Sequence, residues 1–316
     1  STASVSGGKS INAKGFKKNK TDKVGNPISK SYGYFGGGES NPPTTYYATI
    51  DRIDFSSETI SPLGNNLPQG RSALAGASSP NYGYFGGGFY SPPSTYSAVI
   101  DRIDFSNGTT DVAANNLTQA RPSLAGISSP NYGYFGGGWA PPYTDLIDRI
   151  DFSNETTSAA ANNLTESRSY LGATSNSNYG YFAGGSSPTT DLIDRIDFST
   201  ETTSAPGNDL SESRSQLGAV SSSNYGYFCG GYSPPYSDLI DRIDFSNETM
   251  SLPGNDLTEA RYGMGVVSNS NYGYFGAGNG PGAVVTVDKI DFSNDTISPS
   301  TNNLPTAKDK LAAVSG

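Results

Sequence analysis

Hydrophobic and polar residues alternate along short segments of the chain, and none of these segments has helical periodicity. In residues 238–245, Asp-Leu-Ile-Asp-Arg-Ile-Asp-Phe, alternate side chains would point to opposite faces of a sheet. Residues 214–257 predict four strands: A from Arg214, B at Tyr225-Gly-Tyr-Phe, C at 238–245 and D from Met250 to Leu257. Turn residues separate the strands, so we predict a four-stranded antiparallel meander.

The same pattern recurs six times. Tyr-Gly-Tyr-Phe begins at steps of 50, 50, 47, 46 and 47 residues, at Tyr32, Tyr82, Tyr132, Tyr179, Tyr225 and Tyr272. A strand A precedes only the last five copies, and a sixth strand A, from Lys308, ends the sequence. We expect this strand to pair beside the first Tyr-Gly-Tyr-Phe. The prediction is an all-β fold, a six-bladed β-propeller of four-stranded antiparallel blades, closed by the C-terminal strand, which completes the first blade.

The order of a basic residue, a hydrophobic-Gly-Gly segment, an Asp after a strand and then a Leu resembles the kelch repeat, which is also found in the galactose oxidase propeller. The resemblance covers residues 31–316 and implies the same fold. Kelch repeats usually have a Trp in strand D, whereas the single tryptophan here, Trp139, lies in a loop. The motifs YGYFGGG and DRIDFSN also resemble those of repeat proteins encoded by marine cyanophages, which are virion structural proteins.

Charge divides the sequence into two parts. Residues 1–30 carry seven lysines and one aspartate, which gives this segment a net charge of +6. Because the whole chain has a net charge of −9, residues 31–316 carry −15. Because the first segment is polar and poor in apolar residues, we predict that 1–30 is a basic, flexible N-terminal arm and 31–316 the kelch-like propeller. An acidic propeller repels nucleic acid and anionic membranes, which leaves only the arm as a candidate for binding either. No apolar run reaches the roughly 18 residues of a membrane span.

Two sets of basic residues recur in the blades. The first set begins strand A, and we predict that it forms an axial basic ring. Pairing with Glu166, Glu212 and Glu259, two residues upstream, is the favoured role of these residues, and binding of an anionic group is the alternative. The ring consists of Arg71, Arg121, Arg168, Arg214, Arg261 and Lys308. The second set lies in strand C, where we expect Arg242 to pair with Asp244 or with an acid of the adjacent blade rather than to bind anions. Asp244 is also expected to cap the turn between strands C and D.

Catalytic groups are few. The sequence has no histidine, which excludes a His-based triad, a His-ligated metal and the copper chemistry of galactose oxidase. Most acids recur in every blade, whereas a glycosidase pair would occur once. Glu39, Asp111 and Asp309 lie off the repeat but form no recognisable set. Cys229 replaces a Gly or Ala of the repeat, as a small buried thiol would. We therefore predict a protein that is not an enzyme and has no metal site or cofactor.

The loops between strands B and C vary most, and a meander places them all on one face of the disc. Their aromatic residues offer a large contact area at low entropic cost. The candidate binding residues are Tyr46, Tyr47, Phe89, Tyr90, Tyr96, Trp139, Tyr143, Tyr232 and Tyr236. Packing against another subunit is an equally open interpretation of these residues.

These observations favour a non-enzymatic virion structural or adhesion protein, such as a phage fibre, spike or decoration component, located on the virion or outside the cell. Its expected partners are other virion proteins, further copies of itself or a host-surface glycan. The alternative is a cellular kelch-type protein-interaction or lectin-like module.

Overall fold

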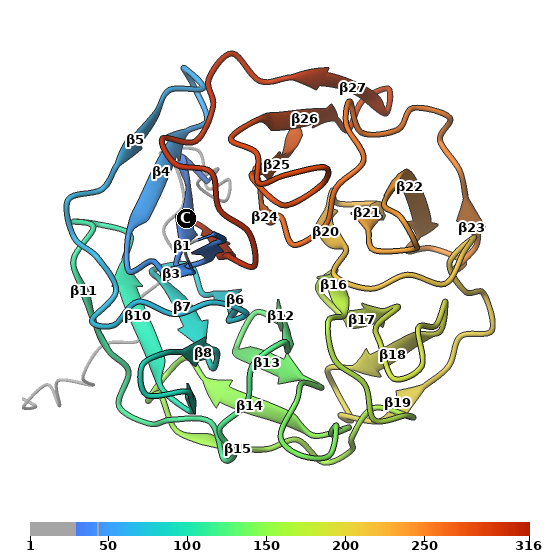
Figure 1. Cartoon of the computed structure of the whole chain (residues 1–316). Helices are drawn as coiled ribbons and strands as arrows, with labels where there is room; N and C mark the ends of the chain where they lie inside the picture. The colour runs from blue at the N-terminus through green and yellow to red at the C-terminus, as the bar shows by residue number, and fades with distance from the viewer. Residues whose placement is uncertain (1–29, 43) are drawn as a thin grey trace, which may run out of the picture.

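Six four-stranded antiparallel sheets surround a central axis in the computed structural model, which describes residues 30–42 and 44–316 (Figure 1). The innermost strands of neighbouring blades contact one another around this axis. From the axis outward, the strands are β28 (Ala312–Ser315), β1 (Tyr32–Gly36), β4 (Ile50–Asp54) and β5 (Ile60–Pro62) in blade 1; β6 (Ala75–Ser78), β7 (Tyr82–Gly86), β10 (Ile100–Asp104) and β11 (Thr110–Val112) in blade 2; β12 (Ala125–Ser128), β13 (Tyr132–Gly136), β14 (Ile147–Asp151) and β15 (Thr157–Ala159) in blade 3; β16 (Gly172–Ser175), β17 (Tyr179–Ala183), β18 (Ile193–Asp197) and β19 (Thr203–Ser204) in blade 4; β20 (Gly218–Ser221), β21 (Tyr225–Gly231), β22 (Ser237–Asp244) and β23 (Met250–Ser251) in blade 5; and β24 (Gly265–Ser268), β25 (Tyr272–Gly276), β26 (Val287–Asp291) and β27 (Thr296–Pro299) in blade 6.

The C-terminal strand closes the ring. β28 pairs antiparallel with β1, from Gly33 opposite Ser315 to Gly36 opposite Ala312. The carbonyl of Gly316 accepts hydrogen bonds from the backbone N–H groups of Ser31 and Tyr32, at 2.8 and 2.9 Å. The predicted six-bladed propeller, completed in blade 1 by the end of the chain, is confirmed.

Strand D is shorter than predicted. In blade 5 it ends at Ser251, and the chain then runs as a loop to the buried Leu257. The N–H of Leu257 donates to the carbonyl of Asp238 at 2.9 Å, so this leucine is anchored without joining the sheet. The predicted arm, residues 1–30, lies outside the described residues except for Lys30.

Glycine allows the blades to pack closely on one another. The second residue of each Tyr-Gly-Tyr-Phe segment faces a side chain of the preceding blade; at Gly180 an added Cβ would lie 2.0 Å from Cδ1 of Ile127. The neighbouring aromatic rings stack between blades, as Tyr134 does on Phe198 with centroids 5.2 Å apart. The resulting core is divided among six inter-blade clusters of buried residues. The high glycine and tyrosine content is therefore a packing requirement of this propeller.

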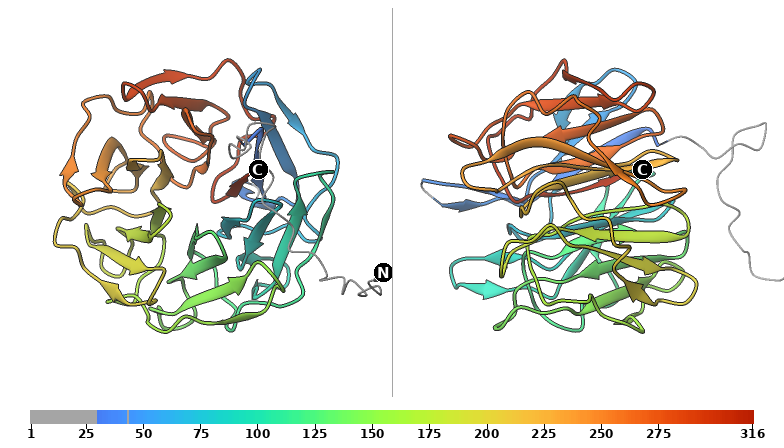
Figure 2. Two further views of the ribbon diagram at one scale, coloured as in Figure 1. Left: turned by 180° about the vertical axis from the view of Figure 1, so that it is seen from behind. Right: turned by 90° about the vertical axis from the view of Figure 1, so that its right-hand side faces the viewer.

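Two hairpins extend the loops between strands B and C. Hairpin β2–β3 (Glu39–Ser40 and Thr45–Tyr46) belongs to blade 1, and hairpin β8–β9 (Phe89–Tyr90 and Thr95–Tyr96) belongs to blade 2. Seen from the side, both project beyond the disc on the same face (Figure 2, right). We call this the hairpin face. Among the described residues, no helix is long and apolar enough to cross a membrane.

Candidate functional site at the hairpin face

The basic residues that begin strand A are buried inside the blades and do not line the axis. The guanidinium of Arg121 is fully buried, lies 2.7 Å from the carboxylate of Asp148 and donates to the carbonyls of Phe135 and Gly137 at 3.0 and 2.7 Å. The same pairing with the aspartate that directly precedes the Arg or Lys of strand C occurs in every blade. The pairs are Arg71–Asp101, Arg121–Asp148, Arg168–Asp194, Arg214–Asp241, Arg261–Asp288 and Lys308–Asp51.

The prediction of an axial basic ring is therefore wrong in its placement. These cations are 0–1% exposed and their charge is already neutralised, so the alternative role fails as well, because an external anion cannot reach them. The favoured pairing with the upstream glutamates contributes little: of the three, only Glu212 comes within ion-pair distance, 3.9 Å from Arg214. The prediction considered the acids nearest in sequence to each basic residue. In the folded blade, the aspartate of strand C lies closer to that residue than these glutamates do.

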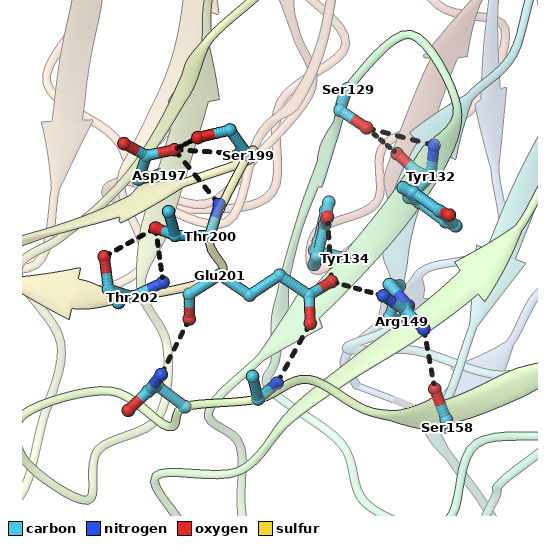
Figure 3. A network of polar contacts seen from close by, with 12 residues as sticks. Ser129, Tyr132, Tyr134, Arg149, Ser158, Asp197, Ser199, Thr200, Glu201 and Thr202 are labelled. Carbon is cyan, nitrogen blue, oxygen red and sulfur yellow. Dashed lines mark hydrogen bonds and ion pairs between the residues drawn. The ribbon is translucent and has the colours of Figure 1, made fainter.

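Basic residues of strand C link neighbouring blades at five of the six seams in the described part of the chain. Arg149 of blade 3 lies 2.6 Å from the carboxylate of Glu201 in the C–D turn of blade 4, which also accepts from the hydroxyl of Tyr134 at 3.2 Å (Figure 3). The expected pairing with an acid of the adjacent blade is confirmed. The complete set is Arg102–Glu155, Arg149–Glu201, Arg195–Glu248, Arg242–Asp295 and Lys289–Glu58.

The aspartate at the end of strand C caps the turn, as predicted. Asp244 accepts hydrogen bonds from the N–H and hydroxyl of Ser246, at 2.8 and 2.6 Å. The hydrogen bonds from Ser246 hold the pKa of this carboxyl below its usual value. The recurring charges that form these pairs and caps are thus explained by structure, and recognition at the hairpin face has to use residues that do not recur.

The mouth of the axis is a closed ring of backbone hydrogen bonds. The third residue of each strand A segment donates its N–H to the carbonyl of the equivalent residue in the preceding blade, at 2.7–2.9 Å, and accepts from the following one. All six residues have left-handed backbones with φ of 52–67°. They are Ala73, Ser123, Tyr170, Gln216, Gly263 and Lys310. The backbone repeats around the ring while every side chain differs, which makes this rim a fixed platform for six different groups.

A pocket of about 380 Å³ lies beside this rim, on the hairpin face. Its volume suits a small ligand or one residue of a larger one. One side consists of aromatic rings: Tyr46 contacts Phe89 edge-on at 5.5 Å, and Tyr96 contacts Trp139 edge-on at 5.0 Å between centroids. The lining is completed by Glu39, Ser72, Ala73, Pro122, Ser123, Tyr143, Ser169, Tyr170 and Lys310.

An ion pair forms the polar wall of the pocket. Nζ of Lys310 lies 2.5 Å from Oε1 of Glu39, and the hydroxyl of Ser72 donates to Oε2 at 2.7 Å. Burial alone would lower the pKa of Lys310, but its hydrogen bond to Glu39 and the charges of Glu39 and Asp309 raise that pKa above its usual value. Burial also raises the pKa of Asp309, against the effect of Lys310. Lys310 and Ser72 thus fix the orientation of the Glu39 carboxylate, and with it the direction of any hydrogen bond from a ligand.

The structure separates the nine predicted binding residues into two groups. Five of them, Tyr46, Phe89, Tyr96, Trp139 and Tyr143, line the pocket. The others lie outside its lining. The hydroxyl of Tyr47 meets that of Ser40 at 3.0 Å, and its ring lies 5.9 Å from Nζ of the buried Lys308. Tyr90 pairs with Thr95 within its hairpin.

Tyr232 and Tyr236 belong to a second aromatic cluster in blade 5. Tyr236 stacks on Tyr262 at 5.6 Å, and Tyr232 contacts the same ring edge-on at 5.7 Å. This cluster therefore packs on itself, with Tyr232 left 38% exposed.

Several pocket residues were missed by sequence reasoning. Tyr170, Ser123 and Lys310 come from the rim, which was interpreted only through its buried arginines. A signal was present: two positions after each basic residue, an otherwise regular repeat has six different side chains. The described residues contain no group of three His, Cys, Asp or Glu side chains placed to hold a metal ion. Aromatic contact and directed hydrogen bonding are what this arrangement offers.

Comparison with known proteins shows the fold. The solved structure of YjhT aligns with 86% of this chain and 97% of its own length, with a TM-score of 0.68 and 13% sequence identity. Altogether, 773 chains of solved structures match this chain. Because the fold is so widely used, it does not by itself indicate a function. No protein-family model matches the sequence, and no curated protein is significantly similar to it. The chain is a six-bladed β-propeller.

Proposed function

We propose that this propeller is a non-enzymatic recognition module that binds a carbohydrate in the pocket of the hairpin face. The observation that carries the proposal is the juxtaposition of Trp139 and Tyr96 with the hydrogen-bonded pair of Glu39 and Lys310 in one pocket. Sugar rings present apolar C–H faces beside hydroxyl groups. A wall of aromatic rings opposite oriented polar groups complements both features.

Two further observations support recognition over catalysis. Four of the lining residues, Ala73, Ser123, Tyr170 and Lys310, belong to a rim closed by backbone hydrogen bonds, so their positions are preorganised at low entropic cost. The acid in the pocket, Glu39, is engaged by Lys310 and Ser72, and the described part of the lining includes no second carboxylate to act with it.

Trp139 provides the test, because it is the only tryptophan and it lies in the pocket. We expect a saturable change in its fluorescence when the protein is titrated with sugars selected on a glycan array. Trp139→Ala should weaken array binding by at least tenfold. Tyr232→Ala is the matched control, since it removes an exposed aromatic residue outside the pocket. Equal loss in both variants, or no saturable ligand on the array, would overturn the proposal.

For the setting, we propose an adhesion component of a phage particle, acting on the virion surface or outside the cell. The similarity of the repeat wording to cyanophage virion proteins supports this, and assembly with virion proteins or with further copies belongs to the same proposal. Its test is mass spectrometry of purified virions, and consistent absence of the protein would overturn it.

A cellular kelch-type protein-interaction module is the second candidate function. The kelch-like repeat order and the two projecting hairpins favour it. A peptide array distinguishes the two: binding of peptides but not glycans, lost in Trp139→Ala, would assign the pocket to protein recognition.

A further inference from the structure

The seam between blades 1 and 2 has the donors of the inter-blade ion pairs but lacks the acid. At the other five seams, a turn Glu or Asp meets an Arg or Lys and a Tyr hydroxyl of the preceding blade. In blade 2 the equivalent turn position is Gly108. Arg52, the cation of this seam, has no ion pair among the described residues. Among residues 30–42 and 44–316, the hydroxyl of Tyr34 has no hydrogen-bond partner either.

The frame of the seam is otherwise preserved. The guanidinium of Arg52 lies 4.5 Å from the ring centroid of Tyr32, as that of Arg242 does from Tyr225. The carbonyl of Gly108 accepts from the side-chain amide of Asn65 at 3.1 Å. The equivalent carbonyl of Glu155 accepts from Asn115 at the same distance. Arg52 is thus held in the paired position without its pair.

The backbone donor of the next seam is not preserved. There, the N–H of Ala114 donates to Oε2 of Glu155 at 3.1 Å. The corresponding residue at the first seam, Gly64, has a left-handed backbone with a φ of 87°. Gly207 and Gly254 are also left-handed, and at their seams the described residues show no such hydrogen bond. Two donors that meet a carboxylate at the other five seams therefore recur here, the cationic side chain and the phenol.

Leu63 fills the space of the missing methylene groups. An added Cβ on Gly108 would lie 3.1 Å from Cδ1 of Leu63, whereas the equivalent positions at the next two seams hold Ala113 and Ala160. An apolar contact thus seals the seam where the glutamate chain would run. The acidic neighbours, Asp54 and Asp104, have counterparts in the other blades, where a carboxylate is nevertheless bound.

We propose that this seam is a binding site for a carboxylate supplied by another molecule, held by Arg52 and the Tyr34 hydroxyl. The five occupied seams show which chemistry the constellation takes, because each contains a Glu or Asp carboxylate that is only 13–21% exposed. Charge-assisted hydrogen bonds of this kind are the strong ones, and a planar group with two oxygens can accept from both donors at once.

The test is a titration of the isotope-labelled full chain with sodium acetate, exchanged against sodium chloride at constant ionic strength. Nuclear magnetic resonance shifts of the Arg52 Nε–H group report the site. We expect saturation with a half-point on the order of 10–100 mM, as a few charge-assisted bonds at a partly exposed site would give. A linear, unsaturated response would overturn the proposal.

Three variants make the test specific. Arg52→Gln should abolish saturation, and so should the double variant Leu63→Ala/Gly108→Glu, which supplies the missing carboxylate and makes room for its side chain. Glu155→Gly should create a second site, visible at the amide of Ala114. Saturation that persists in Arg52→Gln would contradict the assignment.

The source of the carboxylate is distinguished by two probes. A Gly-Gly-Glu-Gly-Gly amide that saturates the site at least tenfold below acetate would identify an acidic side chain of a polypeptide as the ligand, and its Gln version should not bind. Equal half-points for peptide and acetate would identify a small carboxylate. Tighter saturation by inorganic phosphate than by acetate would overturn the choice of ligand class.

Discussion

Removal of the buried cation in one blade should destabilise the whole propeller. In blade 3, Arg121→Met deletes the charge opposite Asp148, and both side chains are fully buried. The carboxylate keeps only the hydroxyl of Thr118, at 2.5 Å, and the carbonyls of Phe135 and Gly137 lose a donor. A buried charge left without its partner costs about 3–5 kcal/mol, so we expect the free energy of unfolding to fall by that amount.

Blade 1 provides the comparison, because a lysine occupies the equivalent position there and pairs with the equivalent aspartate. Nζ of Lys308 lies 2.9 Å from Asp51 and accounts for one charge pair, without the fork of a guanidinium. Arg121→Lys should therefore cost only about 1–2 kcal/mol, the value of the hydrogen bonds that an ammonium cannot make. In the double variant Arg121→Met/Asp148→Leu no charge is left behind, and we expect most of the loss to be recovered.

Equilibrium unfolding in urea, followed by circular dichroism and tyrosine fluorescence, measures these differences. The order of stability should be wild type, then Arg121→Lys and the double variant, then Arg121→Met. A cost below about 1 kcal/mol for Arg121→Met, or equal costs for Lys and Met, would refute the reasoning that the pair is a buried structural unit.

Other predictions concern closure, the turns and the thiol. Deletion of residues 311–316 removes β28 and the buried Leu311 and Val314, and should abolish cooperative folding. Moving residues 308–316 in front of Lys30 should restore folding. Circular dichroism and size-exclusion chromatography test this, and a folded deletion variant would show that closure is dispensable. Hydrogen bonds from serine, foremost the hydroxyl, hold the pKa of Asp197, Asp244 and Asp291 below its usual value. Their contribution to stability is therefore present above the unfolded pKa of about 3.9 and lost as the pH falls through the folded pKa. As the pH falls below about 4, the melting temperature should decrease. The decrease should be less steep when these three aspartates are replaced by Asn, and an equal pH dependence in the variant would contradict the prediction. Burial raises the pKa of Cys229 well above its usual value, so Ellman's reagent should label it only after unfolding, and fast labelling of the native protein would show the thiol to be accessible.

The repeat made the fold predictable from the sequence. Six copies of one strand pattern defined the blades, and the unmatched strand A at Lys308 predicted the pairing of β28 with β1. Local chemistry was predictable as well, because a capping aspartate such as Asp244 acts within its own turn. Strand D was overextended because Leu257 is buried like a strand residue while its backbone is not in the sheet.

The site was predicted less well, because it depends on which segments meet across the blades. Arg121 finds Asp148, 27 residues away, and such a partner is not visible from spacing along the chain. Aromatic residues of the loops were recognised, but the division between the pocket around Trp139 and the self-packed cluster of Tyr232 depends on the three-dimensional arrangement of the loops. Tyr170 was missed because its role follows from its place on the rim rather than from its own sequence neighbourhood.

The rim around the axis has a practical consequence for engineering. Since main-chain hydrogen bonds join its six residues to one another, the identity of a residue such as Tyr170 or Gln216 is decoupled from closure of the rim, within the choices that a left-handed backbone permits. Bulky β-branched residues would be unsuitable there, and most others should be accepted. Combinatorial libraries restricted to these six sites would keep the scaffold intact while presenting a new surface to each target.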